Sequence, residues 1–553
     1  MATYPKNYPF YDWVPKPIGI LILIFLFIPI LTIGGVYSAN SGEMMSGLGL
    51  QSEHIQFVNF VTSVGMASFA PFFYRLVCIR REKMMCIGGF SIMYMLSYVC
   101  AETDSVFLLA LCSVVMGFLR MVLMMVNLFT LILYGFGVEA TRNITPGMEP
   151  TTGEGWDALD KEKSVSQPAI YLFFMILGQI GTSLTAWLAY EYEWQYVYYC
   201  MMGTTLLSIL VIFITMPYHN YVGQRFPINF RQFGNVVTFC VPFICFIYIM
   251  VYGKVLDWYD DPSIIRATII GLFFAGMFFY LESRHRSPYF LLGVLKLRTV
   301  RMGIVLFILL MTLNTSSMFV NIYAGVAMKI DNWQNAVLGN WCIAGYFIGA
   351  VISMFLGSKG VHLKWLFFIG FLIVGASAAW MYFEVQSYGM YERMKIPVII
   401  RATGMMIIYA LTAVHANQRM PFKYLSSWIA IMLSVRMVIG PGIGTALYTN
   451  VFQHRQQYYI TKYAENVDRL NPEADAPFQQ TLRGMKYSGK SETEALNMAT
   501  MSTKGRIQVQ ATLSAIKEMS GWTIYGCLAA AAFVILFPYR KRKLRPEEMI
   551  PKQ

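Results

Sequence analysis

Charged residues are scarce in this sequence. Asp, Glu, Lys and Arg make up 13% of its 553 residues, whereas 56% are hydrophobic. Soluble proteins carry about 25% charged residues, so this composition excludes a soluble multidomain protein. The nine cysteines contain no CxxC pair, none of them falls between residues 450 and 519, and the six histidines are scattered. We therefore expect neither a disulfide framework nor a metal site.

Acidic residues are missing from the apolar stretches in particular, because none of the 30 Asp and Glu lies deep inside one. The same stretches hold no Ser/His/Asp, metal-ligand or paired-carboxylate set. We therefore expect that the protein is not an enzyme and that it needs no cofactor.

Hydrophobic runs are what the sequence has in abundance. Fourteen of them are long enough to cross a bilayer, for which about 20 residues are needed. They lie near residues 18–39, 55–75, 84–101, 106–137, 168–190, 194–217, 234–253, 263–282, 302–328, 335–357, 365–383, 396–415, 424–449 and 520–537. This pattern predicts an all-α polytopic membrane protein with 14 transmembrane helices, surrounded by the lipid bilayer.

Lys and Arg are distributed unevenly between alternate loops. One set of loops holds clusters such as Arg75, Arg80 and Arg81, whereas the short loops of the other set hold only Lys254, Lys329, Arg393 and Lys395. Positive loops stay in the cytoplasm, which places both termini there, in what we expect to be a bacterial inner membrane. The net charge of +13 then reports topology and not nucleic-acid binding.

The spacing of the runs predicts three parts. Residues 1–217 form a six-helix bundle with a cytoplasmic insertion at 138–167, residues 218–301 form two extra helices with connectors, and residues 302–553 form a second six-helix bundle. Two helical bundles that rock around a site between them are how many secondary transporters achieve alternating access. Periodicity alone does not reveal an internal repeat.

Residues 450–519 predict a helical hairpin on the outer side. Ser491 and Glu494 form a capping box that begins a helix running toward the last span. This hairpin would either pack on a partner protein or cap the mouth of the bundle.

Gly484, Gly489, Lys490 and Ser491 match the phosphate-binding pattern G-x-x-x-x-G-K-S. Such a loop needs a buried strand before it, and residues 478–483 have no strand pattern. We therefore interpret the match as chance and expect no use of ATP.

Three motifs resemble one family. Residues 253–265 read GKVLDWYDDPSII, with Trp258 after Asp257; Arg436 is followed by Gly440 and Gly444; and Gln510 with Ala511 precedes the last span. Together with the span count, these motifs resemble the fourteen-span EmrB/QacA type of drug exporter in the major facilitator superfamily. The resemblance implies a secondary active antiporter that exports amphipathic or hydrophobic compounds, such as drugs, weak acids and bile-acid-like molecules. It also implies a periplasmic adaptor and an outer-membrane channel as partners.

The coupling motifs of that family are weak here. Tyr74 stands before Arg75 where the family has Asp, and Gly181 remains in the fifth span while neighbouring family residues are replaced. The first span lacks the carboxylate that proton-coupled exporters of this type usually carry. Glu43 and Glu139, just outside the first and fourth spans, are the substitutes that we would test as proton sites.

Ionisable side chains inside a membrane are functional candidates. The free-energy cost of placing a charge in hydrocarbon restricts them to the bundle interior or a cavity. Arg120, Arg401 and Arg436 are such residues. The alternative is that each donates to backbone carbonyls or extends its charge to the membrane surface. Polar companions, each as suited to a helix contact as to a ligand, lie in the fourth, fifth and ninth spans: Asn127, Gln179, Asn314 and Asn321.

A cavity with arginines and without carboxylates would favour anionic amphiphiles and need little proton coupling. The rival hypothesis is a homologue that has lost its coupling chemistry and acts as a membrane scaffold or sensor. Accumulation of toxic amphiphiles in a deletion strain would separate the two.

Overall fold

The computed structural model describes residues 7–39, 41–72, 81–137, 153–218, 231–284, 288–467, 471–537 and 539. Fourteen helices in these segments are long and apolar enough to cross a membrane, so the expected multi-pass, 14-helix fold is confirmed. Arg75, Arg80 and Glu139, together with the residues at both termini, lie outside the described segments.

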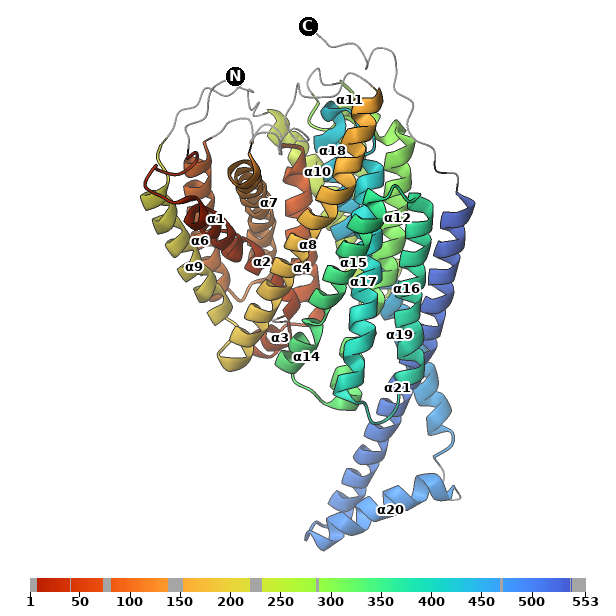
Figure 1. The fold of residues 1–553 in the computed structure, drawn as a ribbon. Helices are drawn as coiled ribbons and strands as arrows, with labels where there is room; N and C mark the ends of the chain where they lie inside the picture. The colour runs from red at the N-terminus through yellow and green to blue at the C-terminus, as the bar shows by residue number, and fades with distance from the viewer. Residues whose placement is uncertain are drawn as a thin grey trace.

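The first six spans, called here the N-half, are followed by two extra spans and by the last six, the C-half. The N-half helices are α1 (Lys16–Phe25) with α2 (Phe27–Ala39), α4 (Ser52–Phe69), α6 (Glu82–Glu102), α7 (Val106–Phe136), α8 (Gly153–Glu191) and α9 (Tyr196–Thr215). The extra helices are α10 (Arg231–Tyr252) and α11 (Pro262–Arg284). The C-half helices are α12 (Arg298–Asn314) with α13 (Met318–Tyr323), α14 (Asn332–Gly339) with α15 (Cys342–Ser358), α16 (Leu363–Glu384), α17 (Tyr391–Ala416), α18 (Leu425–Ser434) with α19 (Gly440–Ala464), and α21 (Glu492–Leu536). Figure 1 shows the N-half in red to yellow beside the C-half in green to blue.

The two halves repeat the same helix pairings. Within each half the first span packs on the fifth, the second on the fourth and the third on the sixth: α2 on α8, α4 on α7 and α6 on α9 correspond to α12 on α19, α15 on α17 and α16 on α21. Between the halves, the fifth span of each contacts the second span of the other, through α8 with α15 and α4 with α18. The chain therefore contains an internal structural repeat.

Glycines allow the second and fourth spans of each half to approach closely. A Cβ added to Gly65 or Gly117 would overlap backbone carbonyls across the α4–α7 contact, and one added to Gly345 or Gly349 would overlap backbone across the α15–α17 contact. Small residues at such contacts stabilise membrane helix pairs, because the backbones gain close van der Waals packing.

Four spans are irregular, and one of them is the tenth, which is interrupted at Asn340 and Trp341 between α14 and α15. Leu26 interrupts the first span, and Pro29 follows it; a proline lacks the N–H that the preceding helical turn would use. The ninth and thirteenth spans, the first and fifth of the C-half, contain π-helical segments at Ala324–Met328 and Val435–Ile439. Such segments are frequent at functional sites.

The extra helices form a hairpin against the contact between the halves, because α10 packs on both α4 and α19. Residues near both ends of this hairpin contact α4. The Tyr252 hydroxyl lies 2.6 Å from His54 Nδ1, and the Tyr289 hydroxyl donates to the Ser68 carbonyl.

The loop between α10 and α11 explains the GKVLDWYDDPSII motif. The Trp258 ring lies where a side chain on Gly253 would project, so only glycine fits there. Asp261 accepts a hydrogen bond from the Ser263 backbone N–H at 2.6 Å at the start of α11, and this bond holds the pKa of the Asp261 carboxyl below its ordinary value.

A helical projection extends beyond the bundle at the predicted outer face (Figure 1). It consists of the end of α19, the separate helix α20 (Pro472–Tyr487) and the start of α21. Arg455 of α19 bonds Glu518 of α21 at 2.7 Å. The predicted capping box of Ser491 and Glu494 is confirmed, whereas α20 is a helix that the sequence analysis did not assign. Gly484 lies inside α20, so the phosphate-loop pattern follows a helix and not a strand.

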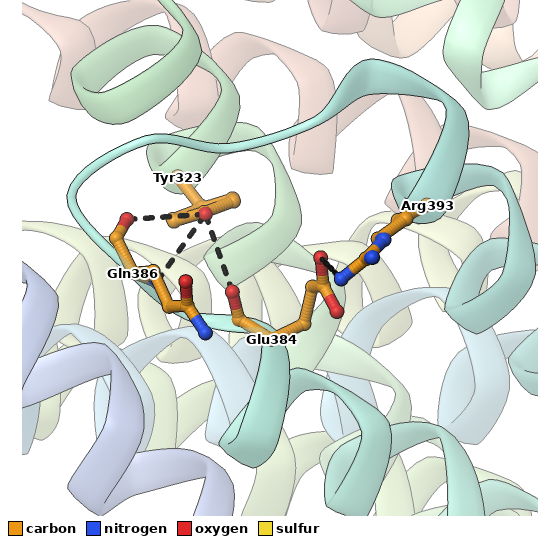
Figure 2. Close-up of polar contacts among 4 residues, drawn as sticks. All are labelled: Tyr323, Glu384, Gln386 and Arg393. Atoms are coloured by element: carbon orange, nitrogen blue, oxygen red, sulfur yellow. Dashed lines mark hydrogen bonds and ion pairs between the residues drawn. The ribbon is translucent and has the colours of Figure 1, made fainter.

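A second outer-face contact joins the ninth span to the loop between α16 and α17 (Figure 2). The Tyr323 hydroxyl donates to the Gln386 carbonyl at 3.1 Å, and Glu384 pairs with Arg393 at 3.6 Å. Tyr323 is fully buried, so this bond satisfies a polar group that lipid could not.

We predict that Gly117→Ala lowers the thermal unfolding midpoint of the detergent-solubilised protein by a few degrees. The added methyl meets the Thr62 carbonyl, and such overpacking costs about 1–3 kcal/mol. Gly276→Ala in α11 is the matched control, because its Cβ meets nothing within 4 Å. Equal midpoints for the two variants would contradict the importance of this contact.

Candidate functional site

A cavity of about 1270 Å³ lies between the two halves. Its lining includes residues from the first, second, fourth and fifth spans of both halves. The eight helices that the repeat relates to one another therefore enclose one shared space. A cavity of this size accommodates a drug-sized molecule, because ligand pockets typically measure about 300–1,000 Å³.

Two arginines face this cavity, one from each half. Arg120 lies on α7, the fourth span, and Arg436 lies in the π-helical segment of the thirteenth span. The two guanidinium groups are close enough to repel each other electrostatically. Arg120 Nε is buried and has no hydrogen-bond partner within the described structure. Both arginines therefore line the cavity, and no ion pair with a carboxylate of the described residues balances either charge.

Arg436 is held in place by its neighbours. Its guanidinium lies over the Tyr409 ring, 4.7 Å from the ring centre, and Nη2 lies 3.9 Å from the Met437 sulfur. A cation stacked on an aromatic face keeps its N–H groups free at the edge. A side chain on Gly440 would strike Met311 of α12, and one on Gly444 would strike Thr315. The Arg-and-glycine motif thus brings the thirteenth span close to the ninth and directs Arg436 inward.

The remaining lining is mostly apolar and sulfur-rich. Nine methionines contribute to it: Met66, Met124, Met125, Met175, Met311, Met354, Met405, Met432 and Met437. Methionine side chains are flexible and polarisable, so they adapt to ligands of different shapes. Tyr171, Tyr346 and Tyr409 add aromatic faces with hydroxyl groups.

Polar contacts between the halves close the cavity at the predicted outer face. Asn340, between α14 and α15, accepts hydrogen bonds from Gln179 at 3.2 Å and from Ser183, both on α8. Farther out, Asn332 of α14 donates to Glu43 of α3 (Ser41–Leu48) at 3.3 Å. Each of these contacts must break if the cavity is to open toward this face.

The cavity lining extends to the predicted cytoplasmic end of α7, at Phe136, and to Lys163 in the first third of α8. A second contact between the halves lies here. Arg419, in the loop after α17, pairs with Asp157 of α8 at 2.9 Å, and the Arg419 backbone N–H donates to Asp160 at 3.2 Å. The structure thus contains hydrogen-bonded contacts between the halves on both sides of the cavity.

The other candidate residues occupy different places. Asn127 donates to the Leu23 carbonyl at 2.9 Å, a contact between α7 and α1, and it does not line the cavity. Asn314 is half-buried and Asn321 is exposed, and neither lines the cavity. Arg401 lies behind the lining, where it interacts electrostatically with Tyr346.

Apart from Arg436, the described motif residues lie outside the cavity. Arg81 precedes α6 and is exposed, Trp258 packs on Gly253, and Gly181 lies against the Leu31 backbone where α8 meets α2. Arg75, Arg80 and Glu139 fall outside the described residues.

Sequence reasoning missed several residues of the site: Asn59, Tyr409, Asn340 and Arg419. Asn59 and Asn340 were polar residues inside predicted spans, so their position at membrane depth was a usable signal. Tyr409 and Arg419 gave no such signal, because their roles depend on which helices meet in space.

The comparisons with known proteins agree with this architecture. No family model matches the chain. Over 388 residues it is 21% identical to the uncharacterized MFS-type transporter YhcA of Bacillus subtilis (strain 168), covering 68% of this chain and 70% of that protein.

Among solved structures, the chain is similar to a point mutant of the nucleoside transporter NupG, with a TM-score of 0.50 and 12% identity, over 93% of this chain and all of the other. The human organic anion transporter MFSD10 aligns with a TM-score of 0.44 and 10% identity over 79% of this chain and 94% of the other; this likeness is too weak to argue from.

The fold is therefore that of the major facilitator superfamily. The sequence relative is an MFS-type transporter and NupG is a nucleoside transporter, which supports a transporter of the major facilitator type.

We predict that Asn340→Ala loosens the outer closure. Loss of the shared acceptor removes two hydrogen bonds, each worth about 0.5–1.5 kcal/mol, so a cavity residue should become reachable from the outer face more often. The measurement is the rate at which a membrane-impermeant maleimide labels Leu31→Cys in a background without other cysteines. Asn335→Ala in the same span, whose side chain takes no part in this contact, should label at the unmodified rate. Slower labelling of Leu31→Cys in the Asn340→Ala variant would contradict a role of Asn340 in the outer closure.

Proposed function

We propose that this chain is a fourteen-span secondary transporter of the EmrB/QacA type, which exports amphipathic organic anions across a bacterial inner membrane by alternating access. Both termini would lie in the cytoplasm. The observation that carries the proposal is the cavity between two structurally repeated halves, with Arg120 and Arg436 directed into it.

The charge of the cavity supports an anionic substrate. Glu162 is the only carboxylate among the described lining residues, and it lies beside Lys163 at the cavity's predicted cytoplasmic end. At the depth of the two arginines, a bound carboxylate, sulfonate or sulfate would supply the missing negative charge. Hydrogen bonds from a guanidinium to such groups are short and about twice as strong as those between neutral partners.

The apolar lining supports an amphipathic substrate. An organic body placed among the methionines and tyrosines would be desolvated, while its anionic group reaches the arginines. This division of the cavity suits hydrophobic weak acids and bile-acid-like molecules better than organic cations, which the arginines would repel.

The contacts between the halves support alternating access. Asn340 and Glu43 take part in closing one side, and Arg419 takes part in closing the other. A transporter that opens to each side in turn must break one set while it keeps the other. An anion leaving a cell with a negative interior would also be driven by the membrane potential, at about 2.3 kcal/mol per charge per 100 mV.

The helical projection beyond the bundle supports a partner on the outer side. With 45 residues, α21 is about 68 Å long at 1.5 Å per residue, roughly twice what the hydrocarbon core requires. A periplasmic adaptor leading to an outer-membrane channel is the partner that the resemblance implies.

The rival hypothesis, a scaffold or sensor that binds without transporting, is favoured by the weak coupling motifs. Purified protein in vesicles distinguishes the two, because a scaffold would bind amphiphiles and give no flux.

We predict that proteoliposomes containing the purified chain transport taurocholate when a membrane potential is imposed without a pH gradient. Arg120→Gln and Arg436→Gln should each reduce the initial rate by about 10- to 100-fold, because a hydrogen bond to a charged group contributes about 1.5–3 kcal/mol. Arg266→Gln is the control, since Arg266 is exposed on α11 and bonds only local groups. Flux that requires a pH gradient and ignores the potential would contradict the proposed driving force.

A further inference from the structure

The two cavity arginines have a consequence for the empty carrier. Their charges remain when the substrate has left, because a guanidinium keeps its proton inside proteins. Carriers with a cavity carboxylate can neutralise that group by protonation before they return. Within the described lining of this cavity, no acidic group lies at the depth of the arginines to play that part.

Glu162 lies on α8 well before the residue with which Arg436 interacts. Arg436 interacts electrostatically with Tyr171 on α8, and Glu162 precedes Tyr171 by nine residues on the same helix. At 1.5 Å per residue, nine residues span about 13 Å. Glu162 also has interaction partners of its own. The other ionisable groups facing the cavity are Lys163, a cation at the same end, and the neutral tyrosines.

Alternating access requires a state in which both sides of the cavity are closed. In that state, water around the two guanidinium groups is restricted, and charges of like sign face each other across a low-dielectric space. A bound anion would compensate the charges, so the loaded carrier could close. The empty carrier has no group that could compensate them, so its closure is disfavoured.

From this asymmetry we propose that the protein is an anion exchanger, in which export of one amphipathic anion is coupled to entry of another anion. The inference rests on the proposed function and adds its coupling mode. The carrier would change sides much faster with an anion between Arg120 and Arg436 than without one, so exchange would be the fast mode and net flux driven by the membrane potential the slow one. No proton would need to cross with the substrate.

The test compares exchange with net uptake in proteoliposomes. Radiolabelled taurocholate is added outside, with equal pH on both sides and with potassium and valinomycin to hold the potential at zero. The vesicle interior contains either unlabelled taurocholate or buffer alone. Internal taurocholate should accelerate the initial uptake by at least about tenfold. Equal rates with and without it would overturn the exchange mechanism and leave the proposed function intact.

Charge variants show whether the arginines cause the acceleration. Arg436→Gln should bring the ratio of exchange to net uptake toward one, because the empty carrier then closes with less charge inside. Arg436→Lys, which keeps the charge, should retain a high ratio, and so should Arg266→Gln. A ratio unchanged in Arg436→Gln, measured on monodisperse protein, would contradict the mechanism; the wild-type ratio tests it even if that variant does not fold.

Complete absence of flux has a different meaning from equal rates of exchange and net uptake. If neither taurocholate nor an aromatic sulfonate enters vesicles under any condition, the proposed function itself fails, and the exchange mechanism fails with it.

Discussion

The structure depends on how charge is accommodated at membrane depth. Hydrocarbon cannot solvate an ion, so an arginine inside a span must face a partner, a cavity or the membrane surface. Arg120 and Arg436 come from different halves of the chain and meet at the cavity between them. The glycines that bring α19 against α12, and the π-helical segment that holds Arg436, can be understood as the means of directing one of these charges inward.

The internal repeat determines which helices of the two halves meet around the cavity. Because each half uses the same pairings, the contacts of α8 with α15 and of α4 with α18 are related to each other. Polar residues close α8 against the C-half at both of its ends, through Asn340 at one and Arg419 at the other. The long helix α8 therefore links the two closures. The extra hairpin of α10 and α11 packs on α4 from outside and contributes none of the described cavity-lining residues.

The sequence predicted the 14 helices because hydrocarbon length is a strong and local signal. It could also single out Arg120 and Arg436, since charge at depth restricts where a side chain points. It could not distinguish them from Arg401, which lies behind the cavity, or Gln179 from Asn127, whose amide bonds the Leu23 carbonyl.

Other features were hidden for physical reasons. The fifth span was predicted to begin near residue 168, yet α8 continues back through Pro168 to Gly153, and α20 has the low hydrophobicity of a solvated segment. The repeat depends on contacts between distant spans, and no periodicity in the sequence encodes them.

The central claim is that the cavity binds anions through its two arginines. Its most direct test is calorimetric binding to the purified chain of two amphiphiles that share one hydrophobic body and differ in the sign of their head-group charge. The account predicts that the anion binds and the cation does not, and that Arg120→Gln and Arg436→Gln each weaken anion binding. Tighter binding of the cation, unaffected by either substitution, would contradict it.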